Sequence, residues 1–338
     1  MAEEVSRIAV SVFKREETGT LPHIQEIQWA QVRADVTNFL SIVILSRGKC
    51  GVTKCVTRYM LGMAAADLLV VISDPLLTVT AGIYFSQSFL FITPVCRLRI
   101  WLVFASTATS VWLTVAFTID RFVAICYENL KTKYCTERTA AVVIGTLSVL
   151  ACLESVPWGF AYQHTEIMDG VPWDCMLTQS FQNSPSWAAF EMFHRILTPC
   201  VPFFLILLFN IQTVRRIVVA SRARRGLRGQ KSGENHKDRE MANRRKSIIL
   251  VFALTGSFIL LWVTQVVFYI YERISLSFVY SVTDPHYITE QISGMLQVLN
   301  SCTNTCIYAM TQRKFRQELK NALKYPLNRI LNFIKRWK

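Results

Sequence analysis

The chain has 338 residues, of which 52% are hydrophobic and 18% are charged, and its formal net charge at pH 7 is +14. A soluble domain of this length carries about 25% charged residues, so the composition favours a polytopic membrane protein built from apolar helices. The positive charge lies in alternate loops, which is the positive-inside pattern of membrane proteins and argues against a nucleic-acid binder.

The basic residues lie mainly in four segments. Of the 37 Lys and Arg residues, 29 fall in residues 46–58, 121–138, 215–246 and 311–338. None falls between Thr139 and His194. We therefore expect the four basic segments on the cytoplasmic side of the membrane and the loops between them outside.

Residues 1–35 contain no apolar core of signal-peptide length, and the first apolar run covers only residues 39–45. A spanning helix needs about 20 residues. Extending this run backwards takes in Asp35 and Arg33, each of which costs about 3 kcal/mol near a helix centre. We expect a truncated first helix that inserts with help from its neighbours or, as the favoured interpretation, a misannotated start of the gene. Residues 1–35 are then an extracellular or misannotated segment.

Six further apolar stretches follow, separated by the basic loops and by outer loops that lack this charge. They cover residues 59–84, 96–126, 139–162, 187–219, 247–271 and 288–310. With the first helix they predict an all-α bundle of seven transmembrane helices over residues 36–310. The amino terminus is expected outside and the carboxyl terminus in the cytoplasm.

Residues 311–338 are predicted to be a cytoplasmic tail. Phe315, Leu319 and Leu323 recur every four residues among Lys and Arg. This spacing predicts a basic amphipathic helix on the inner leaflet, in contact with membrane lipid, that ends before Pro326.

The third apolar stretch carries Cys96 at its outer end and Asp120 with Arg121 at its inner end. The 25 steps from Cys96 to Arg121 make a helix of roughly 37 Å, close to the thickness of a bilayer with its interfaces. In the second stretch Asp67 lies near mid-membrane, where an ionisable residue is a functional-site hypothesis by default.

Motifs in five of these helices resemble those of the rhodopsin-like (class A) G-protein-coupled receptors. The segment TIDRFVAIC is similar to the aspartate-arginine-tyrosine motif, with Phe122 in the tyrosine position. The other matching residues are Asn38, Asp67, Phe258 and Trp262, and Asn304 with Tyr308. Thr264 and Thr305 stand where the family has prolines, which puts in doubt the kinks that let those helices pivot.

Within this family the chain is similar to the orphan group named for G-protein-coupled receptor 139, and to its divergent fish-type members. The matching segments are SRGKC, TRYMLGMAAADLLVVI, LKTKYCTERTAAVV and SCTNTCIYAMTQRKFRQELKNALKYPLN. The group is reported to sense aromatic amino acids.

The resemblance implies a G-protein switch formed by Asp120, Arg121, Phe122 and Tyr308. Asp120 would hold Arg121 at rest and release it to a G-protein helix; the alternative is a pair of charges that merely reach the membrane interface. The base of the sixth helix reads Asn243, Arg244, Arg245, Lys246, without the acidic residue that also holds this arginine in many relatives. We therefore expect a weakly locked resting state with basal signalling.

Three further sites are implied by the resemblance, each with a plainer alternative. Cys96 and Cys175 would form the disulfide that ties the second outer loop to the third helix, or remain free thiols. Phe258 and Trp262 would form a rotamer switch, or ordinary core packing. A sodium ion, the one cofactor we expect, would bind among Asp67, Ser110, Asn300 and Asn304; alternatively Asp67 is protonated and hydrogen-bonded to Asn304.

The ligand pocket is expected in the outer half of the bundle. Val103 stands where amine receptors carry an aspartate, which argues against an amine ligand. Arg99 or Arg195 is a candidate for holding a carboxylate, with the alternative that both extend to lipid headgroups. The candidate pocket residues are Arg99, Val103, Thr107, Glu191, His194, Arg195, Gln265, Phe268, Tyr269, Glu290 and Gln291.

The sequence therefore predicts a plasma-membrane receptor that couples an extracellular small ligand, an aromatic amino acid or a peptide, to heterotrimeric G proteins. It contains no C-x-x-C, G-x-S-x-G, phosphate loop or H-E-x-x-H motif, so we expect neither an enzyme nor a metal centre. A non-signalling or truncated relative is one alternative. A transporter or channel is another, although it needs several ionisable groups or broken helices at mid-membrane, where only Asp67 qualifies.

Overall fold

The computed structural model describes residues 37–48, 50–73, 77, 88–226, 234–275 and 285–322. Within these ranges no side chain is described for residues 128, 182, 220–247, 272–275, 285–288, 290, 291, 298 and 302. The predictions for residues 1–35 and for the end of the tail lie outside the described residues.

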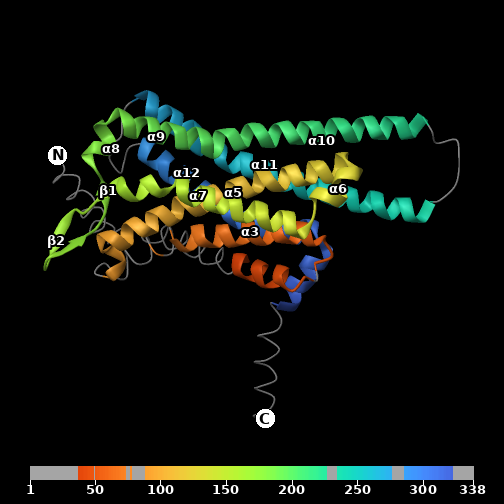
Figure 1. The fold of residues 1–338 in the computed structure, drawn as a ribbon, viewed down its shortest axis with the longest axis horizontal. Coiled ribbons are helices and arrows are strands. Elements are labelled where there is room, and N and C mark those ends of the chain that lie inside the picture. Colours follow the sequence, from red (N-terminus) through yellow and green to blue (C-terminus); the bar gives the residue numbers. More distant parts are fainter. Residues whose placement is uncertain are drawn as a thin grey trace, which may run out of the picture.

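The helices lie side by side in one elongated bundle (Figure 1). Helix α5 contacts α3, α7, α10 and α11, so it is the element around which the others pack. The short helix Thr37–Ser46 precedes α3. The helices are α3 (Lys54–Val71), α5 (Thr93–Cys126), α6 (Glu128–Tyr134), α7 (Glu137–Glu154), α8 (Gln179–Asn183), α9 (Pro185–Arg195), α10 (Val201–Gly226), α11 (Glu234–Ser275) and α12 (Pro285–Thr311).

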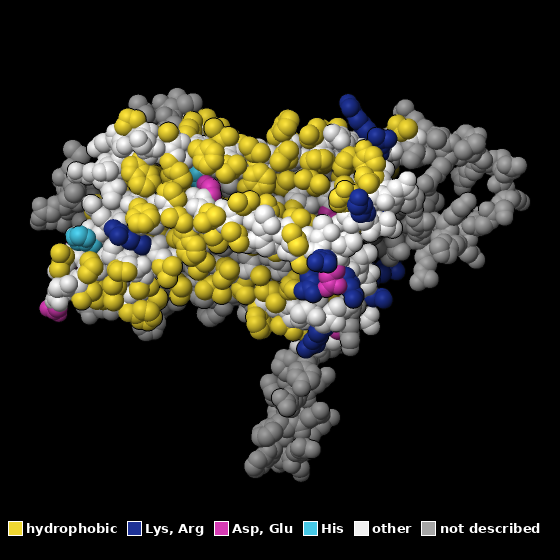
Figure 2. All heavy atoms as spheres, viewed as in Figure 1, with side chains coloured by type: hydrophobic (Ala, Val, Ile, Leu, Met, Phe, Trp, Pro, Cys, Tyr) yellow, Lys and Arg dark blue, Asp and Glu magenta, His cyan; other side chains and the backbone are white. Residues whose placement is uncertain are grey.

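Four stretches are long and apolar enough to cross a membrane: Thr93–Cys126, Glu137–Phe160, Pro185–Val219 and Ile248–Tyr271. Many of their large apolar side chains, such as Leu150, Phe204 and Leu260, are exposed, as lipid-facing side chains are. Figure 2 shows a hydrophobic middle, with Lys, Arg and acidic side chains gathered at the end where α6 lies. The predicted all-α membrane bundle is confirmed, while the count of seven spans stays a prediction at this point.

The short helix Thr37–Ser46 is tied to α12 by polar contacts. The Asn38 side-chain amide donates to the Ser301 carbonyl at 2.9 Å, and the Ser41 and Thr305 hydroxyls are 2.8 Å apart. The Thr305 hydroxyl also reaches Asn38 Oδ1 at 3.2 Å. Thr305, which stands where the resembled family has a proline, therefore contributes hydrogen bonds between the short helix Thr37–Ser46 and α12.

The half of the bundle that the sequence predicts to be cytoplasmic, called the inner half below, contains the larger apolar core. Its fully buried members come from the short first helix, α3, α5, α11 and α12, and include Leu45, Met60, Leu113, Phe117, Leu254 and Tyr308. Residues 313–322 form a helix, as predicted, but Phe315 is fully buried in this same core. The tail helix therefore packs on the inner end of the bundle through Phe315, in addition to any contact with lipid.

The loop between α7 and α9, predicted to be extracellular and called the outer loop below, contains short strands that its sequence does not predict. Strand β1 (Tyr162–Gln163) pairs antiparallel with β4 (Met176–Leu177), and β2 (Glu166–Met168) pairs antiparallel with β3 (Val171–Trp173). Two- and three-residue strands are too short to show an alternating pattern. Gly170 has a φ of +76° in the turn between β2 and β3, a conformation that favours glycine.

Candidate functional site

The outer end of α5 is fixed to the outer loop by a disulfide. Cys96 and Cys175 are bonded, with their Cα atoms 6.3 Å apart, so the predicted pairing is confirmed. The Thr93 hydroxyl donates to the Asp174 carbonyl at 2.9 Å, and the Asp174 amide donates to the Phe91 carbonyl at 2.7 Å. Burial, and after it the charge of Glu166, raises the pKa of the Asp174 carboxyl. The disulfide and these hydrogen bonds hold the outer loop over the end of α5.

The inner end of α5 holds a buried ion pair. Asp120 and Arg121 are 8% and 7% exposed, and Arg121 Nε donates to Asp120 Oδ2 at 3.0 Å. The Arg121 Nη2 group forms an ion pair with the same carboxylate oxygen. The guanidinium carbon lies 5.7 Å from the centre of the Phe117 ring, within the range of a cation–π contact. Each charge compensates the other in a region that excludes water, where a single unpaired charge is costly.

Two cysteine thiols, which the sequence did not single out, also contact Asp120. Cys55 Sγ on α3 donates to Asp120 Oδ1 at 3.2 Å, and Cys135 Sγ donates to the Asp120 carbonyl at 3.5 Å. Cys135 lies between α6 and α7. Cys55 is 65 residues from Asp120, and no spacing rule connects them. These contacts arise from the packing of α3 and of the α6–α7 connection against α5, which the local sequence does not determine.

Phe122 and Tyr308, the other two predicted switch residues, lie in aromatic contacts. The Phe122 ring is 5.3 Å from Phe209 on α10 and 5.6 Å from Tyr127. Tyr308 is fully buried, its ring lies 5.9 Å from Phe315, and its hydroxyl has no hydrogen-bond partner among the described residues. The side chains of residues 243–246 lie outside the described set, so the absence of a second clamp on Arg121 stays a prediction.

Asp67 lies in a cluster of polar side chains from α3, α5 and α12, which we call the Asp67 pocket. The Ser110 hydroxyl donates to its Oδ1 atom at 2.5 Å, and the Asn304 side-chain amide donates to Oδ2 at 2.6 Å. Ser301, which the sequence did not single out, is a third hydrogen-bonding side chain. Asn300 is buried on the same helix, but among the described contacts it does not bond to Asp67. Hard cations prefer oxygen ligands, and the Asp67 carboxylate with the Ser110 and Ser301 hydroxyls supplies them, while the Asn304 amide reaches Asp67 through its nitrogen. The donor set therefore fits a sodium ion.

Phe258 and Trp262 are packed in a second core cluster. Their rings are 5.7 Å apart, and Phe203 lies 5.3 Å from Phe258. Val111 and Ile206 complete the contacts from α5 and α10. Tight packing is compatible with both a rotamer switch and ordinary core packing, so both interpretations stay open.

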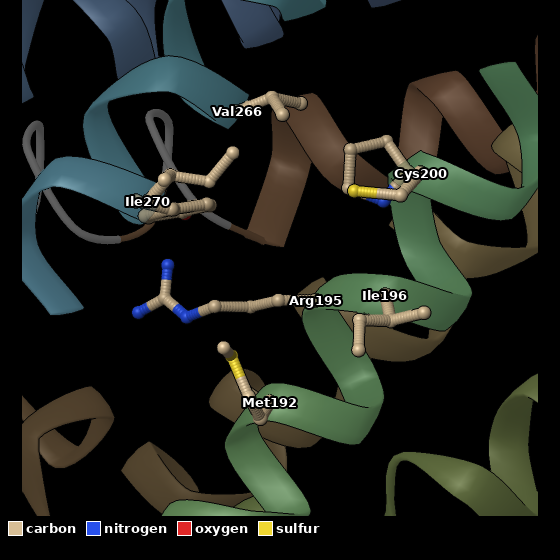
Figure 3. A pocket seen from close by; sticks show the side chains of 8 residues that line it. Met192, Arg195, Ile196, Cys200, Val266 and Ile270 are labelled. Carbon is tan, nitrogen blue, oxygen red and sulfur yellow. The ribbon is translucent and has the colours of Figure 1, made fainter. Parts of the chain in front are cut away.

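A groove of about 350 Å³ lies between the α9–α10 junction and α11 (Figure 3). Arg195 and Tyr269 are the predicted ligand residues that line it, and the Arg195 guanidinium carbon is 3.5 Å from the centre of the Tyr269 ring. Arg195 also forms an ion pair with Glu191, one turn earlier on α9. The complete lining is Met192, Arg195, Ile196, Pro199, Cys200, Val266, Tyr269 and Ile270.

The other predicted ligand residues do not line this groove. His194 is buried, and its Nδ1 atom lies 2.6 Å from Glu154 Oε1, next to the rings of Phe104 and Trp158. His194 therefore joins α9 to α7, while the neighbouring Arg195 points toward α11.

The remaining positions are spread over the outer half. Arg99 Nη2 donates to Cys96 Sγ at 3.7 Å. Val103 is partly buried on α5, and Phe268 is buried on α11 beside Tyr269. The side-chain oxygens of Thr107 and Gln265 are buried and have no hydrogen-bond partner among the described residues. The side chains of Glu290 and Gln291 lie outside the described set.

Comparisons with known proteins match most of the chain. The family profile "7 transmembrane receptor (rhodopsin family)" matches residues 37–308. The C-C chemokine receptor type 8 of Homo sapiens is 23% identical over 303 residues, which are 88% of this chain and 78% of that receptor. The B2 bradykinin receptor of Mus musculus is 24% identical over 286 residues, which are 82% of this chain and 67% of that receptor. The profile match includes both the disulfide and the Asp120–Arg121 pair.

Proposed function

Because the chain belongs to the rhodopsin family of seven-transmembrane receptors, we propose that it transmits the binding of an extracellular ligand to heterotrimeric G proteins. The observation that carries this proposal is the pair of contacts at the two ends of α5. This helix has a disulfide to the outer loop at one end and a buried aspartate–arginine pair at the other. The family is one of multi-pass membrane receptors and is not enzymatic. The basic inner loops support a plasma-membrane orientation with the amino terminus outside.

In this mechanism the ligand shifts an equilibrium between a closed and an open inner face. In the closed state Arg121 is bonded to Asp120 and lies beside Phe117. In the open state the Arg121 side chain leaves Asp120 and contacts the G protein. The basic residues of 215–246 add attraction to acidic lipid headgroups and to the G protein.

We infer that the ligand is a peptide rather than a free amino acid. Two of the relatives are named for chemokines and for bradykinin. Arg195, the groove residue suited to a carboxylate, already forms an ion pair with Glu191, which a free amino acid would have to displace. The resemblance to the group named for G-protein-coupled receptor 139, and with it an aromatic amino-acid ligand, stays a prediction.

The test is a screen for G-protein activation in cells that carry the receptor at a measured surface level, with amino acids and peptides as separate panels. A response to at least one peptide, lost in Arg121→Ala, supports the proposal. A non-signalling relative is the alternative, favoured by the threonines at positions 264 and 305. Normal surface expression with no coupling to any G-protein class, with or without ligand, would establish that alternative.

We also propose that the Asp67 pocket binds sodium. Asp67 is fully buried, and a buried carboxylate needs either a bound cation or a proton to balance its charge. Replacing choline with sodium at constant ionic strength should raise the melting temperature of the solubilised receptor by several degrees, and Asp67→Asn should remove this rise.

The matched control for sodium binding is Asn210→Ala. Asn210 is a buried polar residue whose amide donates to the Thr255 hydroxyl at 2.8 Å, away from Asp67. This variant should melt at a lower temperature and still respond to sodium. An equal sodium response in wild type and Asp67→Asn would contradict the site.

A further inference from the structure

We propose that Cys55 and Cys135 are positioning residues that hold Asp120 in its resting geometry, and that the weakness of their thiols as donors sets the basal activity of the receptor. This inference rests on the proposed function, because it concerns the same aspartate–arginine pair. It extends that function by adding two residues from outside α5 to the pair.

The contacts divide the acceptor atoms of Asp120 among different parts of the fold. Oδ2 accepts from Arg121, Oδ1 accepts from the Cys55 thiol at 3.2 Å, and the backbone carbonyl accepts from the Cys135 thiol at 3.5 Å. Cys55 lies in the first turn of α3, and Cys135 precedes α7. Asp120 is therefore bonded to the two segments that flank α5 on its inner side.

These thiols are placed to act as neutral donors rather than as reactive groups. Cys55 is buried, with 2% of its surface exposed. Burial, and after it the charge of Asp120, raises the pKa of the Cys135 thiol to about 11, so this group keeps its proton at neutral pH. A protonated thiol adds no charge beside the carboxylate, and Arg121 remains the counter-ion of Asp120.

The chemistry of the donor then determines how firmly Asp120 is held. A thiol is a weak hydrogen-bond donor, whereas a serine hydroxyl in the same place is a strong one. Asp120 that is loosely held releases Arg121 more readily, which favours the open state. Replacing sulfur with oxygen at position 55 should therefore lower the basal activity, and removing the donor should raise it.

The experiment measures ligand-independent G-protein activation at matched surface expression for Cys55→Ser and Cys55→Ala. Cys55→Ala should raise the basal output by about two- to fivefold, less than the loss of an ordinary hydrogen bond to a charged group because the thiol is a weak donor. Cys55→Ser should give an output below that of the wild type. The control is Cys50→Ala, because Cys50 is also buried but its thiol donates to the Ile44 carbonyl at 3.7 Å.

Cys135→Ser and Cys135→Ala should follow the same order with smaller changes, because the Cys135 thiol reaches a backbone carbonyl and not the carboxylate. Asp120→Asn serves as the reference variant in the same cells. If Asp120→Asn raises the output while Cys55→Ala and Cys55→Ser both match the wild type, or both raise it equally, the thiol inference is wrong and the proposed function stands. If no cell line, wild type included, gives output above that of mock-transfected cells with or without ligand at normal surface expression, the proposed function itself fails.

Discussion

Replacing Asp120 with asparagine should raise ligand-independent G-protein activation by about three- to tenfold. The substitution keeps the size of the side chain and removes the charge that compensates Arg121. Removing one partner of a buried ion pair typically costs about 3–5 kcal/mol. If only part of this cost destabilises the closed state relative to the open state, the open state becomes populated enough to give the expected rise in output. The measurement is a G-protein biosensor assay without ligand, normalised to surface receptor.

Glu137→Gln provides the matched control for this prediction. Glu137 also pairs with basic side chains, Lys54 and Arg58, but all three are well exposed. Exposed ion pairs contribute little, so the basal output of this variant should stay within about twofold of the wild type. An unchanged output in Asp120→Asn, with normal surface expression, would show that the Asp120–Arg121 pair does not restrain the receptor.

Loss of the outer disulfide should reduce surface expression by about tenfold. Removing a native disulfide typically destabilises a protein by about 2–5 kcal/mol, and here it also releases the strands of the outer loop from α5. Cys96→Ser, Cys175→Ser and the double variant should show the same loss, because each removes the same bond. Flow cytometry on intact and permeabilised cells separates surface receptor from total receptor.

The control for the disulfide is Cys152→Ser. Cys152 is a free, partly buried cysteine on α7, and its backbone carbonyl accepts from Trp101 at 3.0 Å, a contact that the substitution retains. This variant should reach the surface at the wild-type level. A double variant clearly worse than either single variant would mean that the two cysteines act separately.

The large features of the fold could be predicted from sequence because they depend on length and charge. A run of apolar residues as long as a bilayer is thick has one stable form, the helix, since lipid leaves no other partner for the backbone. The ends of α5 were predicted for the same reason. Cys96 and the Asp120–Arg121 pair lie at the boundaries where composition changes.

Contacts between distant segments could not be predicted in this way. The bonds from Cys55 to Asp120 and from Asn38 to Ser301 join residues 65 and 263 positions apart, and nothing in the local pattern connects them. The contacts of the predicted ligand residues could not be predicted from the sequence either. His194 and Arg195 are neighbours in sequence, yet one bonds to Glu154 on α7 and the other lies over Tyr269 on α11. Two successive positions on a helix differ by about 100°, so only the packing decides which neighbour each one meets.

The central claim is that α5 carries a working G-protein switch whose resting state is held only weakly, with Asp120 as the counter-ion of Arg121. The most direct measurement compares basal G-protein activation in cells that carry the wild type, cells that carry Arg121→Ala at equal surface density, and mock-transfected cells. We expect output above the mock level for the wild type and output at the mock level for Arg121→Ala. Wild-type output equal to that of mock-transfected cells, or output that persists in Arg121→Ala, would contradict it.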